Sequence, residues 1–139
     1  MHGSIGMFLS QMREKYPRHF STGCRVVEFG TARPWFIGAD EYVGIDCYDG
    51  KDVDIVGLCH EFDPERAEFD AVVSTEMLEH DPYWQRTLRK AADLLRPGGI
   101  FVFTCASPKR PEHHPEDSPT PGYYGGRSVE EVIECLREA

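Results

Sequence analysis

Two acidic residues and a glycine stand at the ends of short apolar runs, where a nucleoside could bind. Glu28 and Gly30 end the first run, and a glycine there lets the backbone turn sharply and approach a ligand. Asp46 ends the second run, where nucleotide-binding folds place a carboxylate that accepts both ribose hydroxyls. Each carboxylate alone more often caps a strand end or faces water. Together, in this order, they make a nucleoside-binding site as good an interpretation as those structural roles.

A histidine suited to proton transfer follows a later apolar run. His80 is preceded by Glu79, and the ordinary pKa of histidine lies near neutrality. If a substrate must lose a proton before it reacts, His80 is the best candidate for the general base. The alternative is that Glu79 and His80 begin or cap the next helix.

A proline-rich segment near the C-terminus contains further polar residues. Adjacent histidines in such a segment lack the spaced geometry of a structural zinc site, so we expect no metal there. Two tyrosines of the same segment, Tyr123 and Tyr124, could wall a substrate pocket. The potential metal ligands that this interpretation sets aside are Glu112, His113, His114, Glu116 and Asp117.

Short strands must position these side chains. Apolar runs end at Gly, Asp or Pro and are apolar at nearly every position, which is typical of a parallel sheet covered by helices on both faces. Because the carboxyl ends of parallel strands share one edge, the candidate residues should gather there. The five predicted strands are Arg25–Phe29, Tyr42–Asp46, Val53–Val56, Phe69–Ser74 and Ile100–Cys105.

Helices are expected between and around the strands. Residues 4–16 carry an apolar stripe of helical period, and Asp81 can cap a helix that has Pro82 at its first position. Ser128 and Glu131 form a capping-box pattern for a terminal helix. We expect one domain over residues 1–139: an N-terminal helix and linker (1–23), a nucleotide-binding core (24–106), a loop (107–127) and a C-terminal helix (128–139).

The sequence FDAVVSTEMLEH at residues 69–80, followed by LLRPGG at residues 94–99, resembles the class I S-adenosylmethionine-dependent methyltransferases, in particular their small-molecule branch. The resemblance extends more weakly from about Cys24 through the terminal helix. It implies a Rossmann-like α/β fold with strand order 3-2-1-4-5 and flanking helices. It also implies S-adenosylmethionine as the cofactor and a small-molecule methyl acceptor.

The resemblance also implies roles for individual residues. Glu28 and Gly30 would lie in the first cofactor motif, and Asp46 would hold the ribose. His80 would face the substrate side and act as the catalytic residue. The remaining cofactor-binding residues would be Cys47, Cys59 and His60 around the adenine, and Thr75 and Glu76 at the methionine end of the cofactor.

The first cofactor motif departs from the family pattern. The usual E/D-x-G-x-G-x-G reads EFGTARP at residues 28–34, so only Gly30 remains, and the helix after the first strand would be a turn or two. Leu58 stands where many relatives have an aspartate. These departures support an alternative function, a methyltransferase-like binding or assembly module without catalysis. An NAD-dependent oxidoreductase is disfavoured, because residues 31–34 lack a glycine loop to cradle phosphates.

Composition narrows the partners. A formal net charge of -9 disfavours nucleic acid, which attracts clustered Lys and Arg. The five cysteines are odd in number and lack a CxxC spacing, so they are expected to be reduced and buried. Because no signal peptide or membrane span is recognisable, we expect a cytoplasmic protein. The family's sixth and seventh strands have no room here, so a homodimer or another partner should cover the edge of the fifth strand.

Overall fold

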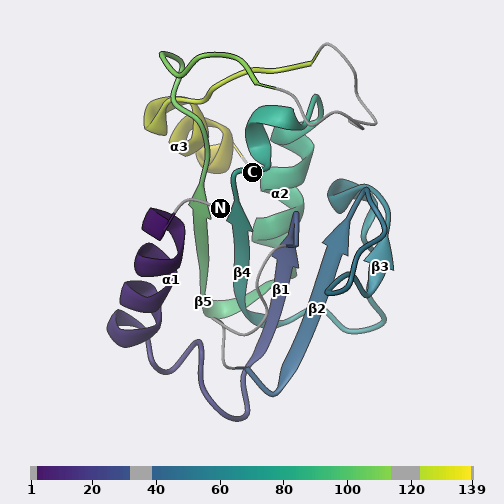
Figure 1. The fold of residues 1–139 in the computed structure, drawn as a ribbon. Helices are drawn as coiled ribbons and strands as arrows, with labels where there is room; N and C mark the ends of the chain where they lie inside the picture. Colours follow the sequence, from purple (N-terminus) through teal and green to yellow (C-terminus); the bar gives the residue numbers. More distant parts are fainter. Residues whose placement is uncertain (1–2, 32–38, 114–122, 139) are drawn as a thin grey trace.

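A computed structural model describes residues 3–31, 39–113 and 123–138 of the chain (Figure 1). The expected short helix after the first strand falls largely in residues 32–38, and His114, Glu116 and Asp117 fall in residues 114–122; both segments lie outside the described residues. The elements are α1 (Gly3–Lys15), β1 (Arg25–Phe29), β2 (Glu41–Asp46), β3 (Ile55–Val56), η2 (Cys59–Glu61), β4 (Phe69–Thr75), η3 (Leu78–His80), α2 (Trp84–Leu94), β5 (Leu95–Thr104) and α3 (Val129–Arg137).

The five strands form one sheet in the order β3-β2-β1-β4-β5. Every neighbouring pair is parallel. The central strands β1 and β4 are almost wholly buried, because each has a neighbour on either side and helices over its faces. The expected Rossmann-like fold and strand order are therefore confirmed.

Alternate residues of the central strands face different helices. Val26 of β1 and Val73 of β4 pack with Leu9 of α1, whereas Val27 and Val72 pack with residues of α2. This division follows from the two-residue period of a strand, which sends successive side chains to opposite faces. The helix α3 packs on α2 through the cluster of Leu88, Val132 and Cys135, and Phe101 and Phe103 of β5 pack against the same cluster.

The termini of several elements differ from the sequence prediction. The strand β5 begins at Leu95, not at Ile100, and its pairing with β4 is irregular between Phe69 and Ala71. The helix α2 begins at Trp84 with Tyr83 as its N-cap residue, so the expected cap at Asp81 with Pro82 at the first helical position is wrong. Asp81 instead accepts hydrogen bonds from the backbone N–H of Tyr83 and the hydroxyl of Thr87 just before and within the first turn. Strongly apolar centres of elements are easier to locate than their ends.

Asp70 joins the amino ends of three strands. Its carboxylate accepts one hydrogen bond from the backbone N–H of Arg25 at 2.8 Å and another from Nε of Arg96 at 2.5 Å. Burial opposes ionisation, but these two bonds outweigh it and lower the pKa of Asp70. The residue therefore connects β4 to both β1 and β5.

The segment after β5 returns to the carboxyl edge of the sheet and is held there by backbone hydrogen bonds. The N–H of Gly125 donates to the carbonyl of Glu79 at 2.9 Å, and the N–H of Arg127 donates to the carbonyl of Ala106 at 2.8 Å. The capping box expected for α3 is confirmed, because Ser128 and Glu131 each bond the other's backbone N–H. The entry to α3 is thus fixed beside η3.

The state of the cysteines and the character of the helices can be compared with the expectations from the sequence. All five cysteines are free thiols, and Cys24, Cys59 and Cys135 are buried as expected. Cys47 is exposed and Cys105 only half-buried, because both follow strands at the open edge rather than lying within them. Among the described residues, no helix has the length and apolar character needed to cross a membrane.

Candidate functional site

A cavity of about 190 Å³ opens at the carboxyl ends of the parallel strands. The candidate cofactor-binding and catalytic residues from the sequence, except Glu28, line its wall, whereas Tyr123 and Tyr124 are not among the lining residues. Crevices at this edge are where open α/β sheets bind ligands. The lining residues are Gly30, Asp46, Cys47, Tyr48, Gly57, Leu58, Cys59, His60, Thr75, Glu76, Met77, His80, Asp81 and Pro82.

Asp46 presents a carboxylate at the end of β2. Its Oδ1 accepts hydrogen bonds from the backbone N–H of Tyr48 at 3.0 Å and from Sγ of Cys47 at 3.4 Å. Among the described residues no hydrogen-bond donor reaches Oδ2, so that oxygen can accept from a ligand. Burial and the neighbouring charge of Asp46 raise the pKa of Cys47 to about 11, which keeps this thiol neutral at pH 7.

Gly30 is required by the local backbone. Its φ angle is +71°, and a Cβ atom there would lie 2.7 Å from Cγ and 2.8 Å from Cβ of Met77. Only glycine adopts this conformation readily, and the contact with Met77 would exclude a side chain in any case. At Gly30 the cavity wall therefore consists of backbone atoms alone.

Glu28 lies beneath the cavity and not in its wall. It is fully buried in β1, and the hydroxyl of Tyr42 donates a 2.6 Å hydrogen bond to its Oε2. Burial and the charge of Glu28 raise the pKa of Tyr42. Glu28 is not among the lining residues of the cavity. Its position therefore does not favour contact with a ligand there.

The short helix η2, which follows β3, supplies another part of the cavity wall. Cys59 and His60 are both buried there, and the His60 ring packs against Tyr83 with 4.7 Å between centroids. Burial raises the pKa of the Cys59 thiol. Together with Leu58, these residues give the wall a mainly apolar surface.

The end of β4 supplies Thr75 and Glu76. Thr75 is buried, and Glu76 has a φ angle of +52°, a conformation that few residues other than glycine adopt. Its carboxylate forms an ion pair with Arg110, and its N–H donates to the carbonyl of Thr104 at 2.9 Å. These contacts hold the strained residue and turn the chain from β4 into η3.

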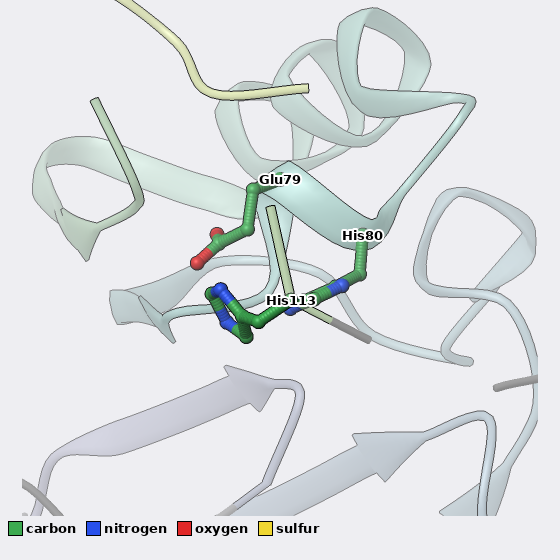
Figure 2. Close-up of side chains that lie close together, drawn as sticks. All are labelled: Glu79, His80 and His113. Carbon is green, nitrogen blue, oxygen red and sulfur yellow. The ribbon is translucent and has the colours of Figure 1, made fainter. Parts of the chain in front are cut away.

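Three potential metal ligands converge beside this turn (Figure 2). Glu79 and His80 come from η3, and His113 comes from the segment after β5. Their ligand atoms all lie within 4.8 Å of one another. The rings of His80 and His113 meet edge to face with centroids 5.0 Å apart, and Tyr124 packs against both.

Glu79 is the most deeply placed charged group of this cluster. It is fully buried, and neither of its carboxylate oxygens has a hydrogen-bond partner among the described residues. Burial is the main cause that raises the pKa of Glu79, and the charge of Glu76 adds to it, while the backbone N–H groups of Glu79 and Ala106 and the charge of Arg110 act in the opposite direction. Burial and the same two carboxylates raise the pKa of Cys105 to about 11.

Several residues that line the cavity were not identified as site candidates from the sequence. Tyr48, Gly57 and Met77 line the cavity only because the segments after β2, β3 and β4 fold back over the edge of the sheet. Asp81, which the sequence suggests only as a cap, lines the cavity as well. The position of Tyr48, Gly57 and Met77 within three residues of predicted strand ends is the one signal that could have marked them.

The model of the family described as "Methyltransferase domain" matches residues 5–128. The chain belongs to this family. Membership confirms the class I S-adenosylmethionine-dependent methyltransferase resemblance, with S-adenosylmethionine as the cofactor. None of the curated proteins matches the sequence.

Solved structures share the fold of this methyltransferase domain at low sequence identity. The [4+2]-cyclase SpnF is 17% identical with a TM-score of 0.70, and the match covers 96% of this chain and 56% of SpnF. The N-methyltransferase NodS of Bradyrhizobium japonicum WM9, in complex with S-adenosyl-L-homocysteine, is 19% identical with a TM-score of 0.66; the match covers 98% of this chain and 73% of NodS.

A third similar structure comes from a complex between the Trm112 methyltransferase activator of Haloferax volcanii and a methyltransferase. It is 18% identical with a TM-score of 0.60, and the match covers 99% of this chain and 76% of the other. The methyltransferase domain described here thus spans little more than half the length of SpnF and about three quarters of the other two.

The cavity has the groups that S-adenosylmethionine needs along its nucleoside. Asp46 offers an oxygen toward the cavity for ribose hydroxyls, and Leu58 and Cys59 offer an apolar wall for a purine. Gly30 contributes only backbone atoms to the wall, at a position where a Cβ atom would collide with Met77. The residues present therefore fit the cofactor that the family implies.

Proposed function

We propose that this methyltransferase domain binds S-adenosylmethionine in the cavity at the edge of the sheet and transfers the methyl group to a small-molecule acceptor. The observation that carries the proposal is the position of Asp46, whose carboxylate lies in the cavity wall at the end of β2. Thr75, Glu76 and His80 line the same cavity from β4 and η3. One cavity thus joins a ribose-binding carboxylate to the proposed reaction end.

Different residues are proposed to contact different parts of the cofactor. Asp46 accepts hydrogen bonds from the ribose hydroxyls, while Cys47, Cys59 and His60 flank the adenine. Thr75 and Glu76 border the methionine end. Glu28 is proposed to act indirectly, by holding Tyr42 and the core under Gly30, since it is buried below the wall.

Methyl transfer requires the protein to align the acceptor with the methyl group more than it requires covalent catalysis. S-adenosylmethionine supplies a methyl group already activated on a sulfonium, which leaves as S-adenosylhomocysteine when the acceptor bonds the methyl carbon. The protein's task is to hold the acceptor in line and to exclude water. His80, in the cavity wall beside Glu76, is proposed to contact the acceptor.

A small-molecule acceptor is supported by charge and by scale. The formal net charge of -9 disfavours binding to nucleic-acid phosphates, and the lining residues of the cavity of about 190 Å³ include no lysine or arginine. Glu76, His80 and Asp81 give the acceptor end polar groups. A compact polar molecule suits that lining.

A non-catalytic binding or assembly module is the second candidate. The observation that favours it is the engagement of Glu28 with Tyr42, which removes the first motif's acidic residue from the cavity. The fold itself does not select between reactions, because SpnF, a [4+2]-cyclase, shares it. Binding without methyl transfer would support this candidate.

The test is calorimetric titration of the protein with S-adenosylhomocysteine and S-adenosylmethionine. We expect binding by the wild type and a loss of at least about tenfold in affinity for Asp46→Asn, because a hydrogen bond to a charged acceptor contributes about 1.5–3 kcal/mol. Asp49→Asn, an exposed neighbour, is the matched control and should bind as wild type. No heat and no thermal shift with millimolar ligand would overturn the proposal.

A partner along the outer edge of β5 is also proposed. In the described part of the chain β5 pairs only with β4, and an open strand edge readily pairs with another chain. Sedimentation at micromolar concentration tests this directly. A monomer under those conditions would contradict a homodimer.

A further inference from the structure

We propose that Glu79, His80 and His113 form a binding site for a divalent transition-metal ion, for which zinc is the probe. Two neutral imidazoles and one carboxylate are a ligand set that zinc and non-haem iron sites share, and such sites keep positions open for a further ligand. The site is distinct from the cofactor-binding part of the cavity. It adjoins that cavity through His80 alone.

The backbone places these three residues on two separate supports. Glu79 and His80 are consecutive in η3, which the N–H of Gly125 ties down at the carbonyl of Glu79. His113 arrives from the segment after β5, and Figure 2 shows its ring beside the Glu79 carboxylate and the His80 ring. Ligand atoms within 4.8 Å of one another need only small side-chain rotations to reach metal bonds of about 2.0–2.2 Å.

The burial of Glu79 is the second, independent observation. A fully buried carboxylate with no hydrogen bond to either oxygen among the described residues is costly, because an unpaired charge loses its hydration. Arg110, whose charge acts on Glu79, is already paired with Glu76. A bound cation would compensate the charge of Glu79 in the direction in which its side chain points (Figure 2).

This assignment corrects how the histidines were grouped from the sequence. Adjacent His113 and His114 lack the spacing of a metal site, and for that reason none was expected in the segment. The fold instead brings His113 to Glu79 and His80, which lie on another element. Sequence spacing carries no information about such a long-range cluster.

The role of the ion rests on the proposed function, whereas its binding does not. An ion held by His80 at the wall of the cavity could take an oxygen of the acceptor in an open position. A hydroxyl bound to such an ion would lose its proton to solvent water more readily, and its oxygen would then bond the methyl carbon as the carbon–sulfur bond breaks, so His80 would serve as a ligand and not as the base. Acceptors that carry a hydroxyl group are the class that this arrangement suits.

Zinc titration of the full chain, freed of metal by a chelator and without any S-adenosylmethionine, tests the site. We expect one zinc ion per chain, bound with micromolar or tighter affinity, and an increase in the thermal unfolding midpoint. Glu79→Gln and His113→Ala should each weaken zinc binding at least about tenfold and abolish the thermal shift. Lys109→Ala, an exposed residue of the same segment, is the control and should bind zinc as wild type.

The result that would overturn the site is zinc binding by His113→Ala as tight as that of the wild type, or no zinc binding by the wild type at 100-fold excess over protein. Asp46→Asn separates the two proposals, because it should lose S-adenosylhomocysteine and keep zinc. Zinc binding in a wild type that binds neither form of the cofactor would overturn the proposed function and leave the metal site standing.

Discussion

The hydroxyl of Tyr42 donates a 2.6 Å hydrogen bond to the buried carboxylate of Glu28, across the neighbouring strands β1 and β2. In the sequence Glu28 marks a cofactor motif, but in the structure its bond points into the core beneath that motif. The pair therefore connects the stability of the sheet to the shape of the loop at Gly30. Four variants examine this region and its surroundings.

Tyr42→Phe removes one donor from the buried Glu28 carboxylate and keeps the ring. Because hydrogen bonds to charged groups contribute about 1.5–3 kcal/mol, we expect a loss of about that size in the free energy of unfolding. Urea denaturation measures it. Tyr83→Phe, which loses only a hydroxyl from a ring that is 43% exposed, is the control; equal stability of the two variants would show that the Glu28 bond contributes nothing.

Gly30→Ala combines an unfavourable backbone conformation with a steric conflict. The φ angle of +71° and the 2.7 Å approach to Met77 predict a destabilisation of about 2–4 kcal/mol. Chemical denaturation provides the measurement. Gly57→Ala is a matched control, because Gly57 lines the same cavity and a Cβ atom there meets nothing within 4 Å. A Gly30→Ala protein as stable as Gly57→Ala would refute the steric argument.

Asp70→Asn tests the carboxylate that joins three strands. The folded protein lowers the pKa of Asp70 below its ordinary value of 3.8, so its stabilising effect is complete above that pH and is lost as the pH falls through the lowered pKa. At pH 7 we expect Asp70→Asn to be less stable than the wild type by about 1–3 kcal/mol.

Unfolding curves at a series of pH values give the decisive comparison for Asp70. The difference between wild type and Asp70→Asn should shrink as the pH falls below 3.8, because the protonated aspartate then resembles asparagine in charge. Asp63→Asn, at an exposed position, should differ little from the wild type throughout. A difference between wild type and Asp70→Asn that stays constant with pH would contradict this account.

Glu79→Gln has a predicted effect on the metal-free protein as well. A neutral amide costs less to bury than a carboxylate without hydrogen bonds, so the variant should be more stable than the wild type at pH 7 by about 1 kcal/mol. Thermal and urea unfolding in excess chelator measure this gain. Glu65→Gln at an exposed position is the comparison. A less stable Glu79→Gln would indicate that the wild-type carboxylate has compensating contacts.

The fold could be predicted from the sequence because its signals are local. The apolar runs around Val27 and Val72 indicate buried parallel strands, and Ser128 with Glu131 marks the start of α3. The start of β5 could not be predicted, since Pro97 and Gly98 are typical of a turn while the pairing with β4 is settled by tertiary contacts.

The site was predictable where residues follow strands directly, as with Asp46 and Thr75. It was not predictable where it depends on packing between distant segments. The burial of Glu28 beneath the wall depends on Tyr42 in the next strand, and the meeting of Glu79 with His113 depends on the path of the chain after β5. Neither follows from residue type or spacing along the sequence.

The segment after β5 is anchored near both of its ends, by Arg110 at Glu76 and by Gly125 at the carbonyl of Glu79. Both anchors lie at η3 or directly before it, at the end of the cavity where we propose that the acceptor binds. Sequence changes between residues 110 and 125 therefore leave both anchors in place. Grafting this stretch between related domains should exchange acceptor preference while leaving cofactor affinity as it was.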